Sequence, residues 1–341
     1  MKRLILLGVG ILLATGVCVL LGLTFQVPDD EKQNGLTGIF DVSVEGDIAY
    51  VTYEGGKPTI YVKSNDVKQV AQLPADRAIE DIVIMPDGNT ILYVNSGKDL
   101  GETNESTVHR VDAATGTDEV LFAKDAIITE LAYDAAIENQ LFYLQADIFT
   151  NYSPAASAYP HEFDIHSFNL EQKTHKQITN LKKYGMASLQ VSGKEDSVYI
   201  QMDADESAET AEEIFETKQR IFQIPLAHPD QSKMIYIPKD TNDLYDFVLV
   251  PDQSMLIYQA VAGTNSNGIY EYELFSYDWE TMETKRLTFH KEHTARPLVG
   301  DDGYFYYMID YNFAGRNTEY ELFRLNPENG DTEQVPLEEL E

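Results

Sequence analysis

Two histidines near the carboxyl end of the chain have the residue types of a metal site. His290-Lys291-Glu292-His293 places two imidazoles three residues apart, with a carboxylate between them. Imidazole nitrogen and carboxylate oxygen are both ligands of Zn²⁺ and Mn²⁺. The spacing differs from the helical His-Glu-x-x-His pattern, so an exposed polar linker explains the same residues. His290 and His293 are therefore candidate ligands of a divalent metal, and no other cofactor is predicted.

Four charged residues form a second candidate site. Asp81, Glu130, Asp246 and Arg296 each lie near the start of a short apolar segment that predicts a β-strand. Where such strands converge on one axis, three carboxylates and a guanidinium meet, and we expect a site for a polar ligand. The structural alternative is that these side chains satisfy backbone groups and hold water.

Other kinds of chemistry have little support in the residues. The chain has no Gly-x-Ser-x-Gly motif for a nucleophilic serine and no glycine-rich loop for phosphate. Its 57 acidic residues offer many carboxylate pairs. Sugar cleavage needs two of them about 5–10 Å apart, a separation that a sequence does not specify.

The elements that would position these residues recur along the chain. A short apolar strand containing tyrosine appears in each of six segments, at intervals of roughly 50 residues. The tyrosines are Tyr50, Tyr93, Tyr143, Tyr199, Tyr258 and Tyr307. The next strand has a second aromatic position, occupied by Tyr61, His109, His166, Phe222, Phe275 and Phe323. We therefore interpret His109 and His166 as packing residues.

The turns between these strands carry a recognisable motif. Met85-Pro86-Asp87-Gly88 and Val250-Pro251-Asp252-Gln253 precede the tyrosine strand, where proline and aspartate favour a tight turn. Leu274-Phe275-Ser276-Tyr277-Asp278 follows it, and the unit ends with Arg286-Leu287-Thr288. This combination resembles the WD40-like (PD40) repeat of TolB-type β-propellers over residues 38–338.

The resemblance implies an all-β fold, a six-bladed β-propeller of four-stranded antiparallel blades. The blades are expected near residues 38–74, 79–123, 128–179, 186–238, 243–288 and 294–337. Because strands alternate in direction, the loop from strand two to strand three lies on the same side as the links between blades. The long insertions fall in these loops, so we place the working face on that side.

Composition narrows the range of partners. Asp and Glu number 57 against 25 Lys and Arg, a formal net charge of −32. Such a charge repels nucleic acid and anionic membrane surfaces, and nucleic-acid binding is excluded on that ground. The only cysteine is Cys18, so the domain that follows has no thiol chemistry.

The amino terminus predicts a membrane anchor. Lys2 and Arg3 precede 22 uncharged residues, Leu4–Phe25, a run long enough to span about 30 Å of hydrocarbon. Residues 1–25 are therefore expected to form a single transmembrane helix, with the remainder extracytoplasmic, and 26–37 a linker. A cleaved signal or a lipoprotein acylated at Cys18 is the alternative, although Val17 is unsuited to the latter.

Two functions remain open. The first is a membrane-anchored extracytoplasmic propeller that binds a protein, a peptide or a wall-associated ligand, without catalysis. The second is a carbohydrate-active hydrolase or lyase that uses axial carboxylates, with a metal at His290 and His293. Some metal-dependent polysaccharide lyases resemble this type of propeller. The absence of a catalytic motif favours the binding module.

Overall fold

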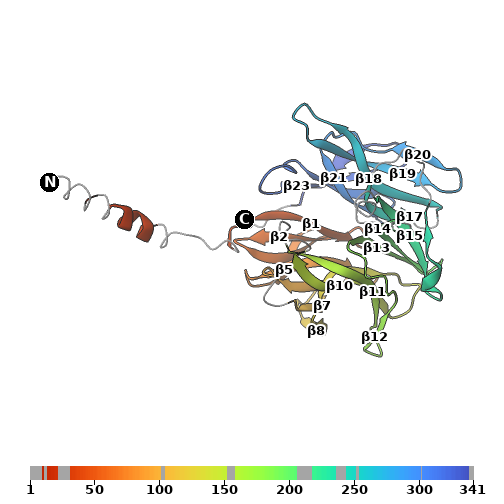
Figure 1. Ribbon diagram of the computed structural model, residues 1–341, viewed down its shortest axis with the longest axis horizontal. Helices are drawn as coiled ribbons and strands as arrows, with labels where there is room; N and C mark the ends of the chain where they lie inside the picture. The colour runs from red at the N-terminus through yellow and green to blue at the C-terminus, as the bar shows by residue number, and fades with distance from the viewer. Residues whose placement is uncertain are drawn as a thin grey trace.

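The computed structural model describes residues 10, 14–21, 31–100, 104–151, 158–205, 217–235, 243–250, 253–300 and 302–337. Nearly all the regular structure in these ranges is β-strand (Figure 1). The predicted anchor over 1–25 and linker over 26–37 lie largely outside them. In the part of the anchor that is described, residues 14–21 are helical. No described helix is long and apolar enough to cross a membrane, so the anchor prediction gains no support.

The strands follow one another in groups of four. The first two groups contain β1 (Gly35–Val42), β2 (Ile48–Glu54), β3 (Lys57–Lys63) and β4 (Val67–Gln72), then β5 (Arg77–Ile84), β6 (Thr90–Gly97), β7 (Ser106–Asp112) and β8 (Asp118–Lys124). Next come β9 (Ile127–Tyr133), β10 (Gln140–Asn151), β11 (Ala158–Asn169) and β12 (Thr174–Gln177), then β13 (Met186–Ser192), β14 (Ser197–Asp203), β15 (Gln219–Pro225) and β16 (Lys233–Met234). A short 3₁₀ helix, η2 (Pro229–Gln231), precedes β16. The last groups are β17 (Leu244–Val250), β18 (Met255–Thr264), β19 (Tyr270–Asp278) and β20 (Glu283–Arg286), then β21 (His293–Val299), β22 (Phe305–Asp310), β23 (Tyr320–Leu325) and β24 (Thr332–Gln334).

These strands pair into five sheets, not into six separate ones as expected. Four sheets have four strands each, and the fifth joins β17–β20 to β21–β24 as an eight-stranded sheet. A single parallel residue pair, Tyr272 with His293, makes the connection. The Tyr272 amide donates to the Glu292 carbonyl at 2.8 Å, which places the start of β21 beside β19.

The first strand of each group faces a common centre. Contacts run from β1 to β5, then to β9, β13, β17 and β21, and β21 contacts β1 again. Figure 1 shows the corresponding ring of twisted sheets. This is the arrangement of a β-propeller, in which each sheet covers the faces of its neighbours because none can bury both faces alone.

Buried tyrosines form the packing between sheets. All six tyrosines of the repeat position are at most 2% exposed. In five groups the tyrosine pairs directly with the aromatic residue of the next strand, as in Tyr93 with His109 and Tyr307 with Phe323. Their rings stack with centroids 4.7 and 5.9 Å apart. The fourth group differs from prediction, since Tyr199 pairs with Gln223 and Phe222 with Ile200.

The threonine that ends the repeat motif has a structural role. Thr288 is 1% exposed, and its hydroxyl accepts a hydrogen bond from the Leu274 amide at 2.8 Å. Thr179 accepts from the Ile165 amide at 2.9 Å in the same way. In these two groups the short fourth strand is therefore followed by a side chain that completes the hydrogen bonding of the third strand.

Candidate functional site

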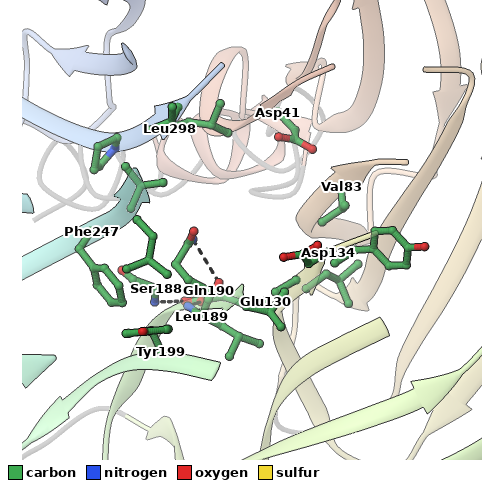
Figure 2. Close-up of a pocket in the computed structure, with 18 of the residues that line it drawn as sticks. Asp41, Val83, Glu130, Asp134, Ser188, Leu189, Gln190, Tyr199, Phe247 and Leu298 are labelled. Atoms are coloured by element: carbon green, nitrogen blue, oxygen red, sulfur yellow. Dashed lines mark hydrogen bonds between the residues drawn. The ribbon is translucent and has the colours of Figure 1, made fainter. Parts of the chain in front are cut away.

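A cavity of about 650 Å³ lies along the centre of the ring. Its walls come from the first strand of every group, and Figure 2 shows Asp41, Glu130 and Ser188 converging on it from three different strands. Cavities of this size hold small ligands or a peptide side chain. The cavity is therefore the first candidate site.

An irregularity at the same place in each first strand aims side chains into the cavity. The pairing register shifts between Ile79 and Asp81 in β5, and between Tyr245 and Phe247 in β17. Ser188, Asp246 and Arg296 have φ of 58°, 31° and 56°, in the left-handed region. Such bulges re-aim side chains and are common beside functional sites.

The four predicted axial residues are brought together. Arg296 Nε lies 4.0 Å from Asp246 Oδ2, and the charges of Asp81, Glu130 and Asp246 all raise the pKa of Arg296, Asp246 most strongly. The Arg296 side chain is 53% exposed, because it lies in the wall of the central cavity and its surface faces that open space. The four residues therefore line one cavity, while their role as a ligand site stays a prediction. Ser188 was missed, because serine carries no charge to mark it in the sequence.

The carboxylates join neighbouring strands. Asp81 accepts from the Leu131 amide at 2.7 Å, and Glu130 accepts from the amides of Ser188 and Leu189 at 3.0 and 2.6 Å. Asp246 accepts from the Arg296 amide at 3.1 Å. Each acceptor thus belongs to one group and each donor to the next.

The same pattern includes two residues of other groups. Asp41 accepts from the Ile84 amide at 2.6 Å, and the Ser188 hydroxyl donates to Asp246 at 3.1 Å. Each first strand is the innermost strand of its group, so amides on its inner edge have no strand partner, and these side chains satisfy them. The structural role that the sequence left open is therefore present at every one of these carboxylates.

Burial changes the protonation of the cluster. Burial raises the pKa of Asp81 to about 8, and the Glu130 charge adds to the effect while the Leu131 amide opposes it. Burial also raises the pKa of Glu130. Near neutral pH the cavity therefore has fewer ionised carboxylates than its acidic lining residues would give in water. Arg296 lies in the same lining.

The two candidate metal ligands have different surroundings. His290 Nε2 lies 2.9 Å from the Tyr307 hydroxyl, and its ring contacts Phe323. His293 stacks on Phe313 with centroids 3.9 Å apart and an interplanar angle of 3°. Burial lowers the pKa of both, so both are neutral at pH 7. Within the described ranges no group of three His, Cys, Asp or Glu residues is placed to hold a metal ion.

Exposed aromatic residues gather on one side of the ring. We call this side the link face: it carries the links between groups and the loops from each second strand to the third. Among the described residues every exposed tyrosine and phenylalanine side chain belongs to these segments: Tyr159, Tyr184, Tyr270, Phe289, Tyr311 and Phe313. The opposite side, with its tight turns, has no exposed tyrosine or phenylalanine within the same ranges, although the exposed His175 and His228 lie there.

No protein-family model matches the chain, and no curated protein matches it. Among solved structures it is similar to TolB from Acinetobacter baumannii, with a TM-score of 0.62, 15% identity, and coverage of 94% of this chain and 67% of that one. It is also similar to an oligogalacturonate lyase in complex with manganese (0.57, 14%, 89% and 77%) and to a prolyl endopeptidase (0.53, 12%, 90% and 50%). The chain spans half the length of the prolyl endopeptidase. At these identities the likeness establishes a β-propeller fold and nothing further.

Proposed function

We propose that the chain is a TolB-like propeller that binds an extracytoplasmic protein or peptide through its link face. The observation that carries the proposal is the gathering of every described exposed tyrosine and phenylalanine side chain on that face. Aromatic residues are enriched at protein interfaces because they bury a large area at a small cost in conformational entropy. A wall-associated ligand would use the same surface.

The proposal includes six blades and a membrane anchor. The eight-stranded sheet divides at one residue pair into two antiparallel halves of four strands, which supports six blades. The anchor at 1–25 rests on the uncharged run after Lys2 and Arg3, and the linker, expected over 26–37, ends earlier than that because β1 begins at Gly35. Because β1 begins at the link face, this tether would hold that face toward the membrane, outside the cytoplasm.

Catalysis by a carbohydrate hydrolase or lyase is the competing function. The axial carboxylates already accept backbone hydrogen bonds, which favours their structural role. Metal analysis of the purified chain decides the metal question. Stoichiometric Mn²⁺ or Zn²⁺ that is lost in a His290→Ala/His293→Ala variant would favour the lyase over the binding module.

A photocrosslinking experiment tests the binding face. A photoreactive amino acid replaces Asn267, an exposed residue in the loop between β18 and β19 on the link face. The control replaces Met282, which is 58% exposed in a turn on the opposite side. We expect a discrete covalent partner with the link-face probe alone. A partner captured equally or only at position 282 would overturn the proposal.

A further inference from the structure

Five rings form one cluster on the link face, where β17, β19 and β21 begin. Tyr272 is the centre, with Tyr245 5.5 Å away at 79°, Tyr270 6.5 Å away at 77° and Phe313 5.5 Å away at 71°. His293 lies 4.9 Å from Tyr272 and stacks on Phe313. We call these residues the rim cluster. Tyr270 and Phe313 are 57% and 45% exposed, so the cluster is accessible.

The rim cluster has a rigid base. Tyr272 and His293 form the residue pair that joins the two halves of the eight-stranded sheet. The Gln259 side chain contacts His293 Nε2 at 3.2 Å and donates to the Thr294 carbonyl at 2.7 Å. Because strands and not loops hold most of the rings, a ligand would meet a prearranged surface and lose little of its binding energy to ordering it.

Carboxylates flank the rings. The charge of Asp243 raises the pKa of Tyr245, after the larger effect of burial. The pKa of nearby Tyr311 is also raised, first by burial and then by the charges of Glu321 and Glu292. An aromatic surface flanked by acids attracts a cation, since the ring face and the carboxylates both favour positive charge.

The chain already forms this kind of contact elsewhere on the link face. The Lys98 ammonium lies 4.6 Å from the centre of the Tyr53 ring, and the Arg286 guanidinium lies 4.6 Å from that of Phe289. Within the described residues no lysine or arginine occupies the rings of the rim cluster. The rim cluster is therefore open to a cation from another molecule.

We propose that the rim cluster binds a lysine- or arginine-rich segment of the partner protein. The net charge of −32 supports such a partner through long-range attraction. The inference rests on the proposed function in one respect, that the link face is a binding face. It goes further by giving the chemistry of the partner and a place on that face away from the central cavity.

Fluorescence anisotropy with the full chain tests the proposal. The probe is a labelled peptide of alternating lysine and glycine, and the comparison is the same peptide with every lysine acetylated. We expect binding of the first and not of the second. Replacing both exposed rings in Tyr270→Ala/Phe313→Ala should weaken binding about tenfold, since each exposed cation–π contact is worth roughly 0.5–1 kcal/mol.

Matched variants separate the rim cluster from the acidic surface in general. Tyr159→Ala removes a similarly exposed tyrosine elsewhere on the link face and should leave binding unchanged. Glu292→Gln should weaken it, and unchanged thermal unfolding confirms that each variant is folded. Equal binding by the double-ring variant, by the acetylated peptide, or by a neutral oligosaccharide in place of the peptide would overturn the proposal. If crosslinking from position 267 captures a partner while the lysine peptide fails to bind, the inference fails and the proposed function stands.

Discussion

At the residue scale, the axial carboxylates act first as hydrogen-bond acceptors between blades. Glu130 accepts two amides of the next first strand, and Asp81 and Asp246 accept one amide each. A hydrogen bond within a protein contributes about 0.5–1.5 kcal/mol to stability, and more where the acceptor is charged. Loss of one such side chain should therefore loosen two blades at once.

Asp81→Asn should change how stability depends on pH. The pKa of Asp81 rises from 3.8 to about 8 on folding, so its protonated form stabilises the fold. That contribution is complete below the unfolded pKa and is lost as pH rises through the folded pKa. Asparagine stays neutral and still accepts from the Leu131 amide. Denaturant unfolding should therefore find the variant similar to the wild type at about pH 4 and more stable at about pH 9.

The control for this prediction is Asp278, a partly exposed aspartate whose pKa is lowered and not raised. Amides of Thr281 and Glu280 lower the pKa of Asp278, so Asp278→Asn should not give a relative gain in stability at high pH. Parallel pH profiles of the wild type and Asp81→Asn would contradict the assignment of a raised pKa to Asp81.

The sequence was enough to predict where the axial charged residues lie. Aligning the repeats placed Asp81, Glu130, Asp246 and Arg296 on one axis without any coordinates. Their hydrogen-bond partners were not predictable, because a sequence does not show which amides of the neighbouring first strand lack a strand partner. The spacing of His290 and His293 allowed a metal site. In the structure His290 contacts Tyr307 and Phe323, whereas His293 stacks on Phe313. These contacts depend on how the groups pack, which the spacing does not show.

At the element scale, buried threonines after the short fourth strands fix the third strands. The Thr179 hydroxyl accepts from the Ile165 amide and donates to Asp164, which is 2% exposed. Asp164 in turn accepts from the Leu181 amide at 2.6 Å in the link to the next group. One threonine thus supports both a strand and the link that follows it.

Thr179→Val should destabilise the protein by about 1–3 kcal/mol, because it keeps the shape while leaving a buried amide without an acceptor. Thr174→Val, at an exposed position five residues earlier in the same segment, should change stability little. Chemical denaturation of both variants measures the difference. Equal stability would show that the hydroxyl contributes nothing to holding the third strand.

The strands themselves were largely predictable from alternation and turn residues. The exception is the fourth group, where Phe222 pairs with Ile200 and not with Tyr199. A shift of one residue exchanges the faces of a strand, and sequence similarity alone did not fix the register there. The merging of the last groups was also not predicted, because it depends on one residue pair, Tyr272 with His293, and on the hydrogen bond from Tyr272 to Glu292.

At the scale of the whole molecule, the ring closes without exchanging a strand between its ends. β1–β4 come from the amino-terminal part of the domain and β21–β24 from its carboxyl end. Tyr50, Tyr306 and Met308 pack across this seam, and Lys63 Nζ donates to the Pro336 carbonyl at 2.6 Å. A second cavity of about 280 Å³ lies at the same seam.

Native-state hydrogen exchange should find the seam less stable than the rest of the ring. Amides of β1 and β23 should exchange through local opening, while those of β9 and β10 exchange only with global unfolding. The reason is that among the described residues no backbone–backbone hydrogen bond crosses the seam, which also contains a cavity. Equal protection of both regions would show that closure is as stable as any other contact between blades.

The central claim is that the link face of the propeller is the surface that binds. Hydrogen exchange of the full chain, alone and with the partner captured by crosslinking, measures this most directly. We predict protection at the start of β19 and in the link around Glu292, with none in the turns of the opposite side. Protection confined to those turns, or to neither side, would contradict the account.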